Sequence, residues 1–114
     1  MAGDAVLETI RIYLEAVRAE GIPVERAILY GSQAKGTADE WSDIDLLVVS
    51  PVFDQPETSD ATDALWRARV ATRGHIEPVG CGPRRWREDD GSPLLAIVRE
   101  EGVEVFGPGK RQRG

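Results

Sequence analysis

The sequence has little of the material needed for disulfides, thiolate metal centres or membrane spans. Its 114 residues include one cysteine, Cys81, and one histidine, His75. A single cysteine excludes an internal disulfide and argues against a thiolate metal centre, so we expect Cys81 to be a small, partly buried residue. No apolar run approaches the roughly 20 residues of a membrane helix, and the first residues lack the basic-then-apolar order of a signal peptide. We therefore expect a cytoplasmic protein that does not interact with membranes.

The composition predicts one globular domain. Hydrophobic residues make up 41% of the chain and charged residues 30%, which is typical of a folded protein. A chain of 114 residues has room for one core and too little for two ordinary domains. We expect the domain to span residues 1–106, and residues 107–114 to form a basic, glycine-rich, flexible tail.

The charge of the chain is acidic and unevenly distributed. Its formal net charge is −6, and the tail holds three of the positive charges, on Lys110, Arg111 and Arg113. Without these three charges the rest of the chain carries −9. Such a surface repels a nucleic-acid backbone, so we expect no tight binding of DNA or RNA by this chain alone. This acidic surface can still bind a nucleotide that carries its own magnesium, because the metal offsets the phosphate charge.

Helical and strand patterns alternate along the chain. The patterns predict helices over 4–20, 32–35, 59–73 and 93–101, and strands over 26–30, 43–49, 75–80 and 103–106. Asp4 is expected to cap the first helix, and residues 82–86 to form a loop or a single helical turn. Pro78 cannot donate a ladder hydrogen bond, which predicts an edge strand or a bend. The alternation favours an α/β or α+β fold, with a small sheet of three or four strands and helices packed mainly on one face.

Two aspartates lie at the start of the strand predicted over residues 43–49. Asp43 and Asp45 are two residues apart, so in a strand they project from the same face while Ile44 points into the core. Both carboxylates can then close on one cation cluster, which predicts a site for Mg²⁺ or Mn²⁺. The apolar run that follows would make unpaired carboxylates costly.

A glycine-serine turn precedes these aspartates. The backbone N–H groups of Gly31 and Ser32, at the start of a short helix, can hold an anionic phosphate, and Gly31 permits its close approach. An ordinary serine-capped turn would use the same residues. Lys35 lies one turn later, either near the phosphates or as a solvated surface lysine. Ser42 can either bind phosphate or cap the loop, and the sequence favours neither role over the other.

These residues carry a family resemblance. Gly31-Ser32, then Gly36, then the run Ser42-Asp43-Ile44-Asp45-Leu46-Leu47-Val48 resemble the signature of the DNA polymerase beta nucleotidyltransferase superfamily, in its minimal nucleotidyltransferase branch. The resemblance implies a mixed sheet and a third carboxylate on a neighbouring strand, where it helps to activate the acceptor hydroxyl. Glu77 is the best positional match for that carboxylate, with His75 or another acid as alternatives. The commoner residue in the family is aspartate.

The resemblance also implies a function. It predicts a metal-dependent enzyme that moves a nucleoside monophosphate, AMP from ATP, to a hydroxyl acceptor and releases pyrophosphate. Larger members carry a further domain for the base or the acceptor, so we expect a partner or a second copy to supply it here. In this branch the partner is often an all-helical HEPN protein, and the pair acts as toxin and antitoxin, with adenylylation of a partner tyrosine. The alternative is a non-catalytic subunit that binds nucleotide or neutralises its partner.

Overall fold

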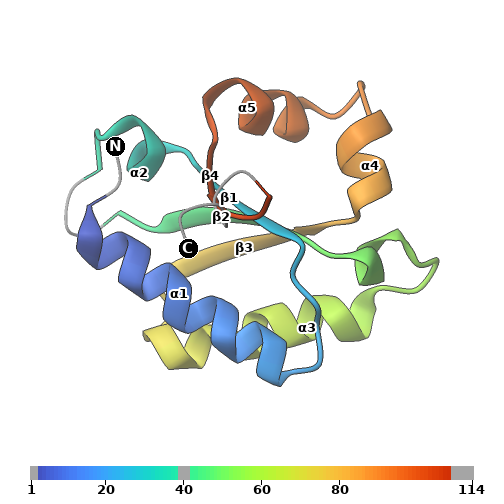
Figure 1. Cartoon of the computed structure of the whole chain (residues 1–114), viewed down its shortest axis with the longest axis horizontal. Coiled ribbons are helices and arrows are strands. Elements are labelled where there is room, and N and C mark those ends of the chain that lie inside the picture. Colours follow the sequence, from blue (N-terminus) through green and yellow to red (C-terminus); the bar gives the residue numbers. More distant parts are fainter. Residues whose placement is uncertain (1–2, 39–41, 109–114) are drawn as a thin grey trace.

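The computed structural model describes residues 3–38 and 42–108, and its elements follow the predicted order (Figure 1). The α-helices are α1 (Asp4–Ala19), α2 (Ser32–Lys35), α3 (Ser59–Ala68), α4 (Pro83–Glu88) and α5 (Pro93–Glu101). Two 3₁₀ turns are η1 (Pro51–Asp54) and η2 (Arg69–Thr72), and the strands are β1 (Arg26–Tyr30), β2 (Ile44–Val49), β3 (Ile76–Cys81) and β4 (Val103–Phe106).

The four strands form one mixed sheet in the order β3-β2-β1-β4. Strand β1 pairs antiparallel with β2 and with β4, while β2 and β3 run parallel. Strand β3 lies at an edge of the sheet, as Pro78 predicts, because an edge strand leaves one side of its backbone without a ladder partner. The predicted fold class, a small mixed sheet with packed helices, is confirmed.

Helices cover both faces of the sheet. The two longest helices, α1 and α3, pack on one face (Figure 1), where Leu14 and Leu65 join Leu46 in the larger core cluster. The opposite face holds a smaller cluster in which Leu95 of α5 packs with Leu47. The expected packing on one face therefore describes the long helices, and the shorter α4 and α5 cover part of the other.

The alternation of side chains along β2 determines which face of the sheet Asp45 occupies. Ile44, Leu46 and Val48 belong to the cluster under α1 and α3, whereas Leu47 and Val49 belong to the cluster under α5. Successive side chains of a strand point to opposite faces. Asp45 therefore shares the face of α5, close to the start of the strand.

The start of α1 differs from the prediction. Gly3 takes the N-cap position, no side chain among the described residues caps this helix end, and Asp4 is the first helical residue. A carboxylate in the first turn still interacts favourably with the positive end of the helix dipole. Asp4 therefore contributes through its charge and not through a capping hydrogen bond.

The other differences from the prediction lie in the second half of the chain. The helix predicted over 59–73 ends at Ala68 and continues as η2, and Arg73 and Gly74 then have positive φ angles of 60° and 78°. The segment left open between loop and helical turn forms α4, over 83–88. Its first turn is capped from a distance, because the backbone N–H of Arg84 donates to Asp54 Oδ2 at 2.9 Å.

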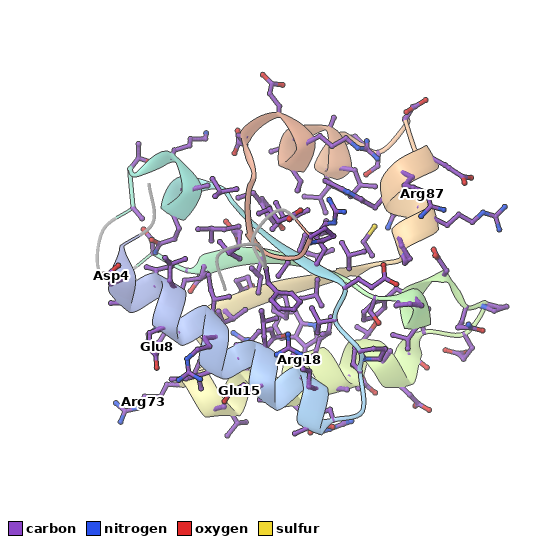
Figure 2. All side chains as sticks on the ribbon, in the orientation of Figure 1. Asp4, Glu8, Glu15, Arg18, Arg73 and Arg87 are labelled. Carbon is purple, nitrogen blue, oxygen red and sulfur yellow. The ribbon has the colours of Figure 1, made fainter. Side chains whose placement is uncertain are left out.

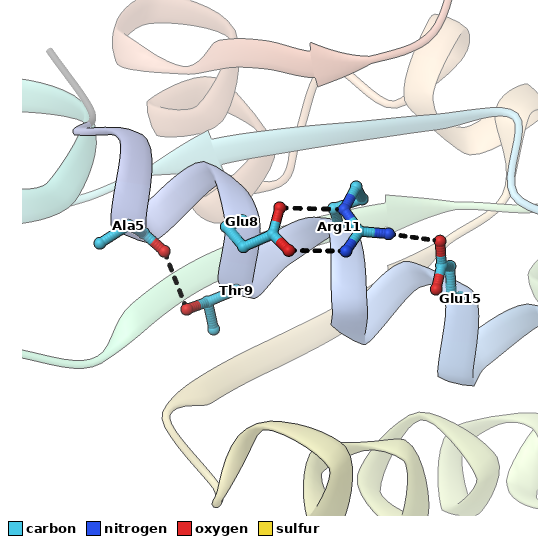
Figure 3. Close-up of polar contacts among 5 residues, drawn as sticks. All are labelled: Ala5, Glu8, Thr9, Arg11 and Glu15. Carbon is cyan, nitrogen blue, oxygen red and sulfur yellow. Dashed lines mark hydrogen bonds and ion pairs between the residues drawn. The ribbon is translucent and has the colours of Figure 1, made fainter.

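The outer surface of α1 carries charges of both signs. Arg11 Nη2 lies 2.6 Å from Glu8 Oε2, and Arg11 Nη1 lies 2.6 Å from Glu15 Oε2 (Figure 3). Glu8 and Glu15 project away from the sheet, as does Arg87 from α4 on the other side (Figure 2). Such exposed ion pairs add little to stability. In the described ranges, no helix combines the length and apolarity that crossing a bilayer requires.

Two predictions concern the end of the chain and its cysteine. Cys81 is buried and free, as expected. Of the predicted tail, Gly107 is buried and Pro108 is exposed. Residues 109–114, which include Lys110, Arg111 and Arg113, lie outside the described residues, so the flexible tail stays a prediction.

Candidate active site

Three residues form a row across the sheet near the start of β2. Tyr30 of β1 is the antiparallel partner of Asp45, and Glu77 of β3 is its parallel partner. Partner residues on neighbouring strands direct their side chains to the same face. The structure therefore places Glu77 where the sequence predicts a third carboxylate, on the strand beside Asp45. The row, Tyr30–Asp45–Glu77, shares the face of α5.

Asp43 lies immediately before β2 and is exposed, whereas Asp45 is half-buried within the strand. Burial raises the pKa of Asp45 above its usual 3.8, and the negative charges of Asp43 and then Glu77 raise it further. The pKa of Tyr30 is also raised, by burial first and then by Asp45 and Glu77. Asp45 therefore lies between the other two predicted carboxylates, two residues after Asp43 and beside Glu77 in the sheet.

The predicted phosphate turn lies directly against Asp45. Gly31 joins β1 to α2 with φ 76° and ψ −154°, a conformation that essentially only glycine adopts. A Cβ atom at this position would collide with Asp45 Oδ2. Glycine is therefore required here for two independent reasons, its backbone conformation and the space occupied by the aspartate.

Ser32 begins α2, as predicted. The carbonyl oxygen of Gly31 accepts hydrogen bonds from the N–H groups of Ala34 at 3.1 Å and Lys35 at 3.2 Å, so the turn continues directly into the helix. No side chain caps this helix end in the part of the chain that the structure describes. The first N–H groups of a helix have no acceptor within it. The amides of the turn can thus serve an external anion.

The structure places Lys35 and Ser42 around α2. Lys35 Nζ lies 3.5 Å from Glu101 Oε2 of α5, so a phosphate contact would require Lys35 to leave this pair. The carbonyl oxygen of Ser42 accepts a hydrogen bond from Gln33 Nε2 at 3.3 Å. Ser42 also lines a hollow of about 220 Å³ with Val6, Thr9, Gln33, Ile44 and His75, among others. Its two predicted roles both stay predictions.

Glu77 is held by an arginine that sequence reasoning missed. Arg69 Nη2 lies 3.0 Å from Glu77 Oε2, and the side chains are 25% and 39% exposed. Across 3–38 and 42–108, no three histidine, cysteine, aspartate or glutamate side chains are close enough together to hold a metal ion. Asp43, Asp45 and Glu77 are thus neighbours that do not form a closed ligand set in this conformation.

Neither Arg69 nor Tyr30 carried a signal in the sequence that indicated a site. Arg69 follows a helical pattern in which a charged residue is an ordinary surface residue. Tyr30 ends an apolar strand and reads as core. Only their partners identify them: the register between β1 and β2 for Tyr30, and the ion pair with Glu77 for Arg69. His75, the alternative to Glu77, is exposed, and its carbonyl oxygen accepts a hydrogen bond from the N–H of Ile44 at 2.9 Å.

Comparison with protein families assigns this arrangement to a class. Residues 10–77 match the family model described as the nucleotidyltransferase domain. The chain therefore belongs to the nucleotidyltransferase domain family, and the matched segment includes the phosphate turn, both aspartates and Glu77. This confirms the family predicted from the sequence. Comparison with curated proteins gives no match.

Solved structures confirm the fold. A toxin–antitoxin crystallised with AMP-PNP is 22% identical, with a TM-score of 0.61 over 94% of this chain and 77% of that chain. A putative nucleotidyltransferase from Sulfolobus solfataricus is 20% identical, with a TM-score of 0.59 over 95% of this chain and 92% of that chain. An MNT antitoxin with a tri-AMPylated HEPN toxin from Shewanella oneidensis is 17% identical, with a TM-score of 0.57, and the match covers 95% of this chain and 77% of that chain. At these identities the likeness establishes the nucleotidyltransferase fold.

Proposed function

We propose that this chain is a divalent-metal-dependent nucleotidyltransferase that transfers AMP from ATP to a hydroxyl group. The observation that carries the proposal is the contact between the Gly31 turn and Asp45, within the row that includes Glu77. A turn suited to phosphate and a group of carboxylates suited to cations lie at the same end of the strands β1, β2 and β3. Nucleotidyl transfer needs both, because it depends on neutralising phosphate charge and aligning the attacking oxygen.

The donor set suits magnesium or manganese. Asp43 and Asp45 offer carboxylate oxygens, which hard divalent cations prefer. Burial, and after it the negative charges of Asp43 and Glu77, raise the pKa of Asp45, and a cation would compensate that negative charge. Asp43 and Asp45 would hold the metal, and Glu77 would join them from β3 once its carboxylate leaves Arg69. When bound, such ions offset the charge of the triphosphate and of the leaving pyrophosphate.

The residues of the chain have distinct roles in the proposed reaction. The N–H groups of the turn at Gly31 and Ser32 hold phosphate oxygens. The acceptor oxygen forms a bond to the α-phosphorus as the bond to the pyrophosphate oxygen breaks, and pyrophosphate leaves. The carboxylate of Glu77 accepts the proton of the acceptor hydroxyl. Lys35 and Ser42 stay candidates for further phosphate contacts.

We further propose that the chain works on or with a HEPN-type partner as an antitoxin. Two observations support this. The fold is shared with an MNT antitoxin in complex with a tri-AMPylated HEPN toxin and with a toxin–antitoxin bound to AMP-PNP. The chain is also acidic, with a formal net charge of −6, which suits a basic partner surface. The cytoplasm is the proposed location.

A second candidate is a non-catalytic subunit that binds nucleotide or neutralises its partner by contact. The ion pair between Arg69 and Glu77 favours it, because the third carboxylate is engaged elsewhere. Surface contact alone, however, does not require both aspartates beside a phosphate turn. The two candidates differ in a product, since only the enzyme releases pyrophosphate.

Pyrophosphate release separates the two candidates. The full chain is mixed with ATP, Mg²⁺ and a HEPN-type partner, and pyrophosphate and partner capture are measured in the same samples. We expect pyrophosphate release that stops when EDTA is added. Partner capture in the same samples shows whether the complex stays intact without the metal. Partner capture without any pyrophosphate would contradict the enzyme and support the neutralising subunit.

A further inference from the structure

Arg69 is fixed by contacts that do not involve a carboxylate. Its Nε donates to the carbonyl oxygen of Ile76 at 2.6 Å, and its Nη2 donates to the carbonyl oxygen of Gly74 at 2.7 Å. Its guanidinium also lies over the ring of Trp66, 4.4 Å from the centroid. The positive charge is therefore held beside the start of β3 whether or not Glu77 is present.

Glu77 is the partner that can move. Its side chain is 39% exposed, and within residues 3–38 and 42–108 its carboxylate is held by one side chain, Arg69, at 3.0 Å. Its strand position is opposite Asp45 in the parallel register of β2 and β3. Neighbouring strands lie roughly 5 Å apart. A change of side-chain rotamer, with no movement of the strand, can thus carry this carboxylate between Arg69 and the aspartates.

We propose that Arg69 is a positioning residue that holds Glu77 apart from Asp43 and Asp45 until a divalent cation enters the site. This inference rests on the proposed function. Three carboxylates gathered without a counterion repel one another. A fixed guanidinium removes one of them from the cluster in the metal-free protein. A divalent cation attracts the same carboxylate more strongly than a partly exposed ion pair does, so metal entry draws Glu77 across.

Removal of the Arg69 guanidinium should strengthen metal binding. In the full chain, Arg69→Met removes a positive charge beside the site and releases Glu77, so Mn²⁺ alone should bind about three- to tenfold more tightly than in the wild type. Mn²⁺ affinity is measured by electron paramagnetic resonance of the free ion. Arg69→Lys keeps the charge but loses the forked contacts to the carbonyl oxygens of Ile76 and Gly74, so its Mn²⁺ affinity should lie between those of the wild type and Arg69→Met. Adding Glu77→Gln to Arg69→Met should abolish the gain.

The matched control is an arginine of the neighbouring helical turn. Arg67 Nη2 forms a 3.0 Å pair with Oε1 of Glu20, the C-cap residue of α1, and takes no part in the row of Asp45 and Glu77. Arg67→Met should leave Mn²⁺ affinity unchanged. A general effect of removing one positive charge from this acidic protein would instead tighten Mn²⁺ binding in both variants and overturn the specific role of Arg69.

A second measurement avoids dependence on the stability of Arg69→Met, which loses two contacts to backbone carbonyl groups. A crystal structure of the wild-type chain with Mn²⁺ should show Glu77 turned to the metal and Arg69 still bound to the carbonyl groups of Gly74 and Ile76. Mn²⁺ on Asp43 and Asp45 with Glu77 still paired to Arg69 would overturn this inference and leave the proposed function standing. An absence of Mn²⁺ binding by wild type and variants alike would overturn both.

Discussion

Replacing Asp45 by asparagine is expected to reduce nucleotidyl transfer by about 10³-fold. The substitution removes the negative charge of a carboxylate that we propose as a metal ligand, and a catalytic metal contributes several kcal/mol of transition-state stabilisation. The shape of the side chain is nearly unchanged, so the contact with Gly31 is kept. The rate is measured as pyrophosphate release at saturating ATP and Mg²⁺, in the presence of the acceptor.

The same variant should not be less stable than the wild type. The folded-state pKa of Asp45 is raised, so its charged form disfavours folding and the metal-free wild type loses stability as pH rises from 3.8 through the folded pKa. Asparagine carries no charge, so the variant does not lose this stability. We expect its free energy of unfolding to exceed that of the wild type by a few tenths of a kcal/mol, up to about 1, because the group is half-exposed. Urea unfolding in EDTA at neutral pH measures it. Asp63→Asn, at an exposed position of α3, is the matched control for both activity and stability.

The rate of pyrophosphate release and the stability of Asp45→Asn together distinguish a defect of the site from damage to the fold. A low rate in a protein that unfolds at lower urea concentration would indicate damage to the fold. A low rate with unchanged or higher stability assigns the loss to the site. Full activity in Asp45→Asn would contradict a metal-binding role for this residue.

Replacing Gly31 by alanine should lower both stability and activity. The φ of 76° with ψ of −154° is strained for alanine, at a cost of about 1–3 kcal/mol, and the new methyl group would also displace the Asp45 carboxylate. Because displaced catalytic groups commonly cost about 10²-fold in rate, we expect a loss of that order in pyrophosphate release. Urea unfolding reports the stability change in the same protein.

A second glycine separates the two causes. Gly21 also has a positive φ, of 92°, but a Cβ there meets no atom within 4 Å. Gly21→Ala should show backbone strain alone, with activity unchanged. In an Asp45→Ala background, Gly31→Ala should cost less stability than in the wild type, since the colliding oxygen is gone. Equal costs in both backgrounds would contradict the collision with Asp45.

Local patterns were sufficient to predict much of the fold. The strand over 26–30 and the helix over 93–101 appear with the predicted bounds, because apolar spacing and a proline in the first helical turn define them. Ser92 caps that helix, accepting a hydrogen bond from the N–H of Leu95 at 3.2 Å. Helix α4 was not predicted firmly, because its charged sequence has no apolar period and its cap, Asp54, comes from 30 residues away.

The candidate site was also predicted only in part. The residue types and spacing of Gly31, Asp43 and Asp45 indicated the phosphate turn and the carboxylates, although β2 begins at Ile44 and Asp43 lies just before it and not within it. The partners of Glu77 depend on the register of β3 and on the turn after α3, and neither can be read from the residues around it. Sequence reasoning therefore supplied the acids and missed Arg69, the side chain that decides where one of them points.

The most direct test of the account follows two labels in parallel. The full chain is incubated with a HEPN-type protein, the proposed partner, together with Mg²⁺ and ATP labelled at either the α- or the γ-phosphate, and label in the acceptor is counted. A nucleotidyltransferase must transfer the α-label and release the γ-label as pyrophosphate, and Asp45→Asn must lose the transfer. Label that enters the acceptor from the γ-position, or no transfer from the α-position while the complex is intact, would contradict nucleotidyl transfer as the activity of this site.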